Sequence, residues 1–526
     1  MFSANLHRYI FLFGLIGLAA GMLFGTVPTS IPQIILAINW LLENNFRWKW
    51  HTIKANNIFW VLISVFLLHV IGMSYTENVG RGLDDLRNKM PLIILPLILL
   101  STKPLSDREF KFLFYFFFLA VFISSVYCYA VYAGLTKKII FDVRKASVFM
   151  SHIRFSLFIA FAVIALIYWS LKEKSIIMKL ICISAVPWFL FFMYKLEMAT
   201  GFLCLISVGL LLLIVFSLKQ LPKTISVMVL MMVLFFVVIF INKASESFHM
   251  FDKITKSPSN ILLQKTKNGR QYLQDTIFGI AENGTLITIN INDEELQQEW
   301  NKRSNIAFNS FDNKGNNLRY TLLRYLASKG FTKDSVGVSN LSNQDIKYIE
   351  NGISNYKYSS NSGLVSRWRE MVWEYTKYKR GENPSGHTLT MRLEFWKTGS
   401  YIVRQNPIIG VGTGDIQNAF DEMYKYTNSK LDLAWRLRCH NQYLAIAVAF
   451  GFVGLAVFLF YLFYPAFVLR KKLHYLYWSF FLIALLSFIT EDTLETQSGV
   501  TFFIFFQTLF LWLASFNNSN ESIQTN

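Results

Sequence analysis

One histidine stands where a polar part of the chain meets an apolar one. The sequence there reads RLRCHNQYLAIAVAFGFVGLAVF, with His440 and Asn441 at the junction and Arg436 and Arg438 before it. An imidazole with an ordinary pKa near 6.5 is available as a neutral base at pH 7, and nearby arginines would keep it neutral. His440 is therefore a candidate general base. Donation of a hydrogen bond to phosphate, or a role as a helix cap, are the alternatives.

A second group of candidates is the basic segment TKKIIFDVRKASVFMSHIRFS, which lies between two apolar runs. Its cations are Lys137, Lys138, Arg144, Lys145 and Arg154. Arginine presents a planar set of donors that suits phosphate, so the segment is a candidate anion site. Contact with lipid headgroups or with acids elsewhere in the chain is an equally good interpretation. Arg154 is the stronger candidate, because an unpaired cation at the start of an apolar helix is costly and usually functional.

The composition indicates the setting of these residues. Of 526 residues, 53% are hydrophobic, 17% aromatic and only 16% charged. A soluble protein cannot bury so much apolar surface, and a disordered chain needs low hydrophobicity. We predict an all-α polytopic membrane protein. The net charge of +18 first reflects basic cytoplasmic loops, and no nucleic-acid partner is expected. The four cysteines form neither a disulfide framework nor a CxxC pattern.

Apolar runs long enough to cross a bilayer predict about twelve helices. Nine runs are clear and three are weaker because they are short or interrupted by proline or a charge. The clear ones lie near 9–27, 57–74, 112–134, 155–171, 202–218, 225–242, 441–469, 475–490 and 499–515, and the weaker ones near 30–44, 90–101 and 178–194. The first run lacks a clear cleavage site, so we expect a retained helix rather than a signal peptide.

The connections between these runs indicate which way the chain faces. With the N-terminus inside, the inner connections 45–56, 102–111, 172–179, 219–224 and 470–474 all carry lysine or arginine, as the positive-inside rule requires. Both termini are then cytoplasmic and the long polar stretch is extracytoplasmic. The predicted organisation is nine membrane helices in 1–242, a large loop domain in 243–440, three helices in 441–516 and a loose polar tail in 517–526. Within the loop, Asn317–Ser328 and Val365–Lys379 look helical, and Thr285–Asn292 alternates like a strand.

The junction at His440 resembles the signature of the O-antigen ligase and O-antigen polymerase family. His440 and Asn441 are followed by nine residues, Gly451, two residues and Gly454. A second resemblance is the Arg-x-x-x-Trp element and glycine-rich turn in MRLEFWKTGSYIVRQNPIIGVGTGDIQNAF, formed by Arg392, Trp396, Pro407, Gly410, Gly412 and Gly414. The basic segment with Arg144 and Arg154 is similar to a third element of the family. The glycine pair suits close helix approach, and the turn would return the loop to the membrane.

The resemblance implies a GT-C-like glycosyltransferase of the bacterial inner membrane. Such enzymes transfer a glycan from undecaprenyl diphosphate to lipid A–core, or to a second lipid-linked glycan, at the periplasmic face. His440 would deprotonate the acceptor with inversion, without metal or cofactor. Arg154 and Arg392 would hold the diphosphate. The remaining candidates for contact with the substrate, near the rim, are Arg144, Lys145, Arg436, Arg438 and Asn441.

Other activities fit the same residues. A polymerase or a protein O-oligosaccharyltransferase shares the signature. A flippase for a lipid-linked glycan would instead be expected to carry charges within its helices. Asp84 and Asp85 would suit a metal-dependent transferase, but no second acidic cluster completes a metal site. Glu491 and Glu495 could orient an arginine or bind the acceptor, although a solvated acidic loop is the simpler interpretation. His69 is expected to be a satisfied core residue.

Overall fold

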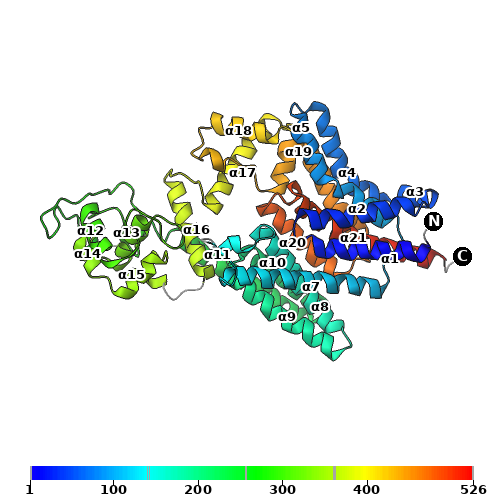
Figure 1. Cartoon of the computed structure of the whole chain (residues 1–526), viewed down its shortest axis with the longest axis horizontal. Helices are drawn as coiled ribbons and strands as arrows, with labels where there is room; N and C mark the ends of the chain where they lie inside the picture. The colour runs from blue at the N-terminus through cyan, green and yellow to red at the C-terminus, as the bar shows by residue number, and fades with distance from the viewer. Residues whose placement is uncertain (1–2, 139, 141–142, 255–257, 359–362, 524–526) are drawn as a thin grey trace. The chain divides into compact units, whose positions relative to one another are not determined.

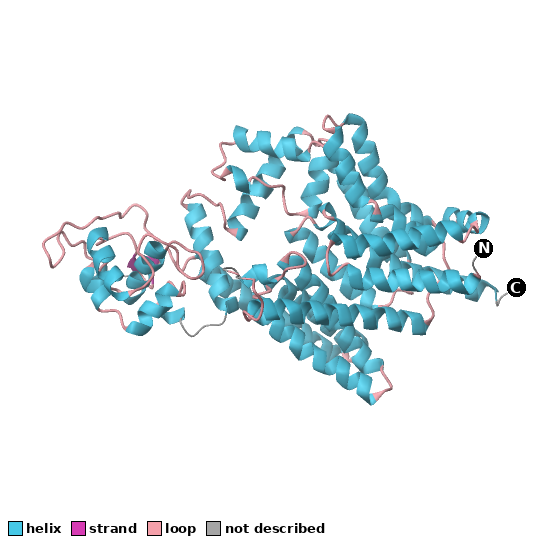
Figure 2. Ribbon diagram, viewed as in Figure 1, coloured by secondary structure: helices cyan, strands magenta, loops and turns pink. Residues whose placement is uncertain are grey.

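The chain is mostly helical over the residues that the structure describes. The computed structural model describes residues 3–138, 140, 143–254, 258–358 and 363–523. Within these residues the one sheet is the antiparallel pair β1 (Ala281–Glu282) and β2 (Thr285–Leu286) (Figure 2). In the described part of the chain, eight helices are long and apolar enough to cross a membrane. The prediction of an all-α polytopic membrane protein is confirmed.

The described chain divides into two compact units (Figure 1). The first, termed the bundle, comprises residues 1–136, 146–212 and 391–526, and the second, termed the loop unit, comprises 137–145 and 213–390. Two of the unit boundaries thus fall within α-helices, α10 (Ala199–Gln220) and α17 (Thr388–Gln405). Residues 391–440, which the sequence groups with the large loop, pack with the membrane helices. The side of the membrane on which 243–440 lies stays a prediction.

The bundle contains every segment that was predicted to span the membrane except 225–242 and the end of 202–218. Besides part of α10 and most of α17, its elements are α1 (Ala4–Gly21), α2 (Thr26–Leu42), α3 (Phe46–Lys54), α4 (Asn57–Gly72), η1 (Met73–Tyr75), α5 (Val79–Lys89), α6 (Pro91–Leu100), α7 (Asp107–Tyr132), α8 (His152–Lys172), α9 (Ile176–Lys195), α18 (Ile416–Tyr426), η5 (Leu433–Trp435), α19 (Gln442–Val468), α20 (Tyr475–Thr490), η6 (Thr493–Glu495) and α21 (Gln497–Ile523). The tail predicted to be loose is helical to Ile523.

All twelve predicted segments are helical, but not all have the length and apolarity of a span. Eight do, and α2 and α20 are shorter apolar helices. The spanning candidates are 57–75, 107–132, 152–172, 176–195, 199–220, 223–248, 442–468 and 497–515. The helix α1 and the ten-residue α6 are in neither group. Twelve spans therefore stay a prediction, and the described helices support eight.

An aromatic cluster forms the centre of the bundle. Phe117 of α7 and Phe161 of α8 lie 5.2 and 4.8 Å from the ring of Phe506 in α21. Phe161 also contacts Phe480 of α20 at 5.6 Å. Offset and edge-to-face ring pairs each add about 0.5–1.5 kcal/mol beyond the area they bury. The many phenylalanines thus join four helices into one packed core.

Helices α8 and α20 run antiparallel. Phe161 packs on Phe480, and further along α8 the hydroxyl of Tyr168 lies 2.8 Å from Nε2 of His474, before the start of α20. Increasing residue number in α8 therefore corresponds to decreasing number in α20. The beginning of α8, with Arg154, and the end of α20 lie at the same end of the bundle.

Helix α19 is interrupted at Gly451, whose φ is +62°. The backbone of the glycine-rich turn binds at this break: Val411 and Gly412 donate to the carbonyls of Val448 and Ala449 at 3.0 and 2.9 Å. On the other side, Phe452 donates to the carbonyl of Pro407 at 2.7 Å. Because these bonds replace helix bonds, the break leaves few backbone groups unpaired.

Glycine is required on both partners of this crossing. A Cβ on Gly451 would lie 2.3 Å from the carbonyl of Ile408, and one on Gly410 would lie 2.4 Å from the backbone of Ala449. Gly454 lies in the next turn, where a Cβ would meet Leu68 of α4 at 3.3 Å. The signature glycines therefore serve a loop crossing as well as the helix contact that the spacing predicts.

The loop unit has its own hydrophobic core. It contains η2 (Val143–Ala146) up to Lys145, the end of α10, α11 (Lys223–Phe248), η3 (Pro258–Asn260), α12 (Asp293–Arg303), α13 (Leu318–Lys329), α14 (Ser335–Ser339), α15 (Asn343–Glu350), η4 (Tyr356–Tyr358) and α16 (Gly363–Lys379). Trp300, Leu322, Tyr325, Ile349 and Val372 are fully buried at its centre. The helices predicted at 317–328 and 365–379 are α13 and α16. The predicted strand is shorter, because only Thr285–Leu286 pairs as a ladder and Ile291 forms isolated bridges.

Candidate functional site

His440 lies at the junction of three bundle segments. Its φ is +45°, in the left-handed region that residues other than glycine rarely adopt. Asn441, not His440, caps α19: its Oδ1 accepts from the amide of Leu444 at 2.9 Å. Nδ2 of Asn441 donates to the carbonyl of Ile489 at 3.1 Å, which ties the start of α19 to the end of α20. The imidazole packs on Phe395 of α17, with 5.6 Å between ring centres.

Two carboxylates of the connection between α20 and α21 face this imidazole. Nδ1 of His440 lies 3.3 Å from Oδ1 of Asp492 and 4.0 Å from Oε2 of Glu491. Glu491 and Asp492 are only 5% and 7% exposed. The interpretation of this connection as a solvated acidic loop is therefore wrong. The structure supports the alternative interpretation, in which an acid of the connection orients an arginine.

These acids determine the protonation of His440. Burial disfavours the imidazolium and Arg392 also opposes it, but Asp492 and Glu491 outweigh both, so the pKa of His440 lies above its ordinary value. The expectation that arginines hold this histidine neutral is thus wrong in direction. The sequence shows the arginines beside it but not the acids that fold onto it.

Arg392 of α17 shares Glu491 with the histidine. One guanidinium nitrogen of Arg392 donates to Oε1 of Glu491 at 2.8 Å, and the arginine side chain is 18% exposed. The predicted cation and the predicted base therefore contact one carboxylate. An anion that reaches Arg392 has to compete with Glu491, which links anion binding to the surroundings of the imidazole.

The same acids raise the question of a metal. His440, Glu491 and Asp492 each offer a ligand atom, and these atoms lie within 4.8 Å of one another. Imidazole and carboxylate together suit divalent zinc or manganese. Here, however, Glu491 is already paired with the guanidinium of Arg392 at 2.8 Å. A divalent cation bound to Glu491 would lie beside that positive charge and be repelled by it. The donor set fits an ion-pair network better than a metal centre.

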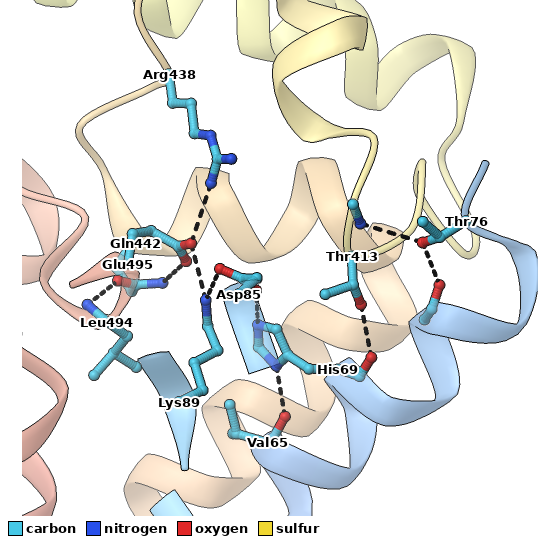
Figure 3. A network of polar contacts seen from close by, with 12 residues as sticks. Val65, His69, Thr76, Asp85, Lys89, Thr413, Arg438, Gln442, Leu494 and Glu495 are labelled. Carbon is cyan, nitrogen blue, oxygen red and sulfur yellow. Dashed lines mark hydrogen bonds and ion pairs between the residues drawn. The ribbon is translucent and has the colours of Figure 1, made fainter. Parts of the chain in front are cut away.

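A buried lysine anchors the acidic connection from beneath (Figure 3). Lys89, at the end of α5, is fully buried and donates to Asp85 at 2.7 Å and to Glu495 at 2.9 Å. Arg438 reaches Glu495 from the other side at 3.5 Å. Gln442 accepts from the amide of Leu494 at 2.7 Å. Glu495 is therefore also buried and paired, and the connection is held at its far end by α5 and α19.

The charged groups of this network shift one another's pKa values. Burial disfavours ionisation of Glu495, but Lys89 and Arg438 outweigh it and hold the pKa of Glu495 below its usual value. Burial raises the pKa of Asp85, and Oδ2 of Asp85 lacks a hydrogen-bond partner among the described residues. Burial opposes the charge of Lys89, but Asp85 and Glu495 outweigh it and raise the pKa of the lysine, which is thus their shared counter-ion.

The glycine-rich turn also contacts this network, through α4. Thr413 donates to the carbonyl of His69 at 2.7 Å, and the amide of Gly414 donates to Thr76 at 3.2 Å (Figure 3). His69 itself is buried, and its Nδ1 bonds the carbonyl of Val65 at 2.7 Å. His69 is thus a satisfied core residue, as predicted. The turn binds backbone on α4 and α19, so its glycines serve packing rather than phosphate.

Arg154 lies at the same end of the bundle, at the start of α8. The hydroxyl of Ser151, the N-cap of α8, accepts from the amide of Arg154 at 3.3 Å. Nε of Arg154 is buried and has no hydrogen-bond partner among the residues that the structure describes. A buried guanidinium nitrogen without a partner is costly, which favours an anion there.

The other basic candidates differ in their surroundings. Arg144 and Lys145 belong to the loop unit, where Arg144 donates to Thr388 at 3.1 Å. Arg436 donates to the carbonyls of Leu431 and Ser429 at 3.1 and 3.4 Å, so it holds its own loop. Of the arginines at the signature, Arg392 and Arg438 are the ones that contact buried acids.

Asp84 and Asp85, the two acids of the alternative metal hypothesis, lie in different surroundings. Asp84 is exposed and pairs with Arg87 at 3.1 Å, whereas Asp85 is buried against Lys89. They do not face one site. The sequence reasoning missed Lys89, Asp492 and the buried state of Glu491 and Glu495. A usable signal was the concentration of seven charged side chains in two short stretches, 84–89 and 491–495, between apolar runs.

The fold and the site together describe a helical membrane protein with a histidine, arginines and paired acids at one end of its bundle. Residues 347–459 match the model of the O-antigen ligase family. The resemblance seen in the sequence is confirmed, and this segment belongs to that family; it holds Arg392, Arg438 and His440 but not the acids of 491–495. No curated protein matches the chain.

Proposed function

We propose that this protein transfers a glycan from undecaprenyl diphosphate to lipid A–core at the periplasmic face of the bacterial inner membrane. Both termini then face the cytoplasm, and 243–440 faces the periplasm. The family match supports a transferase of the O-antigen ligase or polymerase type. One observation of the site supports the chemistry most: the buried carboxylate of Glu491 connects His440 with Arg392.

The reaction that fits these residues is an inverting displacement. The acceptor oxygen forms a bond to the anomeric carbon, the bond from that carbon to the phosphate oxygen breaks, and undecaprenyl diphosphate leaves with the electron pair. The acceptor proton passes to His440. Since Nδ1 of His440 faces Asp492 at 3.3 Å, Nε2 is the nitrogen that accepts it. Asp492 then stabilises the imidazolium, as an acid that orients a catalytic histidine does.

The arginines hold the leaving group. Arg392 and Arg154 are permanently charged and stabilise the charge that develops on the diphosphate. Arg438 and Lys89 hold Glu495 and so position the connection that carries Asp492. The donor needs no metal in this scheme, because guanidinium groups supply the positive charge.

Complementation of a ligase-null host tests the proposal. The wild-type chain should restore full-length glycan on lipid A–core, and His440→Ala should accumulate undecaprenyl-linked polymer at equal membrane levels. A wild-type chain that changes glycan length without restoring attachment would instead identify a polymerase. A glycan found on protein would identify an oligosaccharyltransferase, and wild-type activity of His440→Ala would refute the assigned base.

A further inference from the structure

A large cavity lies at the end of the bundle opposite His440. Its volume is about 1350 Å³. It is lined by His474, just before α20, and by Phe510 and Ala514 near the far end of α21. The His440 site lies beyond the other ends of the same two helices. At about 1.5 Å per residue, α20 alone separates them by about 24 Å, so the cavity is not part of that site.

The wall of this cavity is built by specific contacts. The guanidinium of Arg8 donates to both oxygens of Glu109 at 2.9 and 2.6 Å. It also donates to the carbonyls of Lys103 and Pro104 at 2.7 and 2.9 Å. Trp512 donates to the carbonyl of Thr102 at 3.0 Å. These bonds fix the connection between α6 and α7 against α1 and α21.

Most of the cations around the cavity are not neutralised by its acids. Six basic side chains and three acidic ones line it. Glu109 forms an ion pair with Arg8, and Glu43 forms one with Lys49 at 2.9 Å. Asp107 is the remaining acid of the lining. Among the residues that the structure describes, four lining cations are exposed and have no acidic partner: Lys103, Arg108, Lys172 and Lys472. Of these, Lys172 lies over the ring of Tyr168 at 5.0 Å, and the other three are available to an anion.

The inner wall has the opposite character. Phe11, Phe110 and Phe510 line the cavity and are almost fully buried, and Trp40 and Trp169 lie beside them. Exposed cations and a buried aromatic wall thus share one cavity. A soluble anion would pair with the cations but would make no contact with the aromatic wall. A zwitterionic lipid carries no net charge, so it would leave the excess positive charge unneutralised.

We propose that this cavity binds one anionic phospholipid from the leaflet on the side of the chain termini. Its phosphate lies among Lys103, Arg108 and Lys472, and an acyl chain covers the aromatic wall. Basic pockets between membrane helices on the cytoplasmic side suit such headgroups. The positive-inside rule explains basic connections, but it explains neither a cavity of this size nor its aromatic lining.

The test measures lipid bound to the purified full-length protein by native mass spectrometry. Phosphatidylglycerol and phosphatidylcholine are titrated separately. We expect wild type to hold one phosphatidylglycerol with at least tenfold preference over phosphatidylcholine, since each cation near an anionic headgroup strengthens binding. Equal binding of the two lipids would overturn the proposal.

A matched pair of triple variants locates the site. Lys103→Gln/Arg108→Gln/Lys472→Gln should weaken phosphatidylglycerol binding at least tenfold. Arg47→Gln/Lys174→Gln/Lys471→Gln removes the same charge from exposed positions in basic connections of the same end that do not line the cavity. It should change binding less than twofold. Equal loss in both triples, or loss in neither, would contradict the assignment.

Competition on the wild-type protein separates a lipid from a free anion and needs no variant to fold. Millimolar inorganic phosphate should leave the bound phosphatidylglycerol in place. Complete displacement by phosphate would identify a soluble-anion site and refute the role of the aromatic wall.

Discussion

The two ends of the bundle hold comparable charges in opposite ways. At the His440 end, Lys89 is fully buried and contacts two carboxylates, and Arg392 and Arg438 each contact one. At the cavity end, Lys103, Arg108 and Lys472 are exposed and lack acids among the described residues. Burial makes an unpaired charge prohibitively costly, whereas water tolerates it. The buried charges of Lys89, Glu491 and Glu495 therefore come in paired sets that position chemistry, and the exposed cations at the cavity end are left available for a ligand.

The largest effect is expected from the base at the buried end. His440→Ala should lower the transfer rate by about 10³-fold, since a general base contributes about 10²–10⁴. Transfer to lipid A–core by purified protein in defined lipid is the measurement. Lys471→Gln serves as the control: Lys471 is exposed at the cavity end and does not line the cavity, so this variant should retain wild-type rates. Similar losses in both variants would remove the distinction between the two ends.

A stability comparison of two lysines tests the role of burial directly. Lys89→Met should destabilise the protein by about 3 kcal/mol, because it leaves buried carboxylates uncompensated. Lys103→Met at the exposed end should stay within about 0.5 kcal/mol of wild type. Thermal unfolding in detergent measures both.

A second substitution checks the cause. Adding Asp85→Asn to Lys89→Met removes one of the stranded carboxylates and leaves Glu495 with Arg438, so part of the lost stability should return. If the double variant is less stable than Lys89→Met, charge pairing is not the reason that Lys89 matters.

The pH dependence of transfer reports on Asp492. His440 acts as a base when neutral, so the rate should rise with pH through a raised pKa that lies above 6.5. Asp492→Asn removes a group that favours the imidazolium, so the midpoint should move to lower pH. The rate at the plateau should fall by about 10²-fold because the base is no longer oriented. An unchanged midpoint would show that Asp492 does not govern the histidine.

A substitution at Gly451, where the glycine-rich turn crosses α19, should have a smaller effect on stability. Gly451→Ala should cost about 2 kcal/mol, because φ is +62° and such a conformation is strained for a side chain. A new Cβ would also meet the Ile408 carbonyl. Gly209 of α10 has nothing within 4 Å of an added Cβ, so Gly209→Ala should be neutral or stabilising. Thermal unfolding compares the two.

Chelation should have the smallest effect. If Arg392 rather than a divalent cation neutralises Glu491, removal of metal from purified protein should leave the transfer rate unchanged. A loss that zinc or manganese restores would assign His440, Glu491 and Asp492 as metal ligands and would replace the proposed mechanism.

The sequence predicted the helices well, and it placed His440 and Arg392 near one another. Long apolar runs identify membrane helices with little dependence on tertiary contacts, and each predicted run is helical. The signature predicted that His440 lies at a helix start and that Arg392 belongs near it, and the structure joins both to Glu491. A local pattern sufficed because these residues lie next to elements that hydropathy identifies.

The acids could not be predicted in the same way. Whether Glu495 is solvated or buried depends on Lys89, which lies 406 residues earlier in the chain. The break at Gly451 is hidden for a similar reason, since α19 is continuously apolar and its partner, Pro407–Gly412, is another segment of the chain. Both features arise from pairings between distant segments.

The backbone crossing at Gly451 has a consequence for the way in which this chain tolerates change. Pro407–Gly412 and Val448–Val453 are joined by main-chain hydrogen bonds, so the stretch between them is a loop whose two ends are fixed. The closure entropy of such a loop grows only slowly with length. Residues inserted near Asn428–Lys430 would leave His440 in place, and a chain cut there would keep its two pieces associated. The fixed ends thus let the length of this segment change while His440 and Arg392 stay where they are.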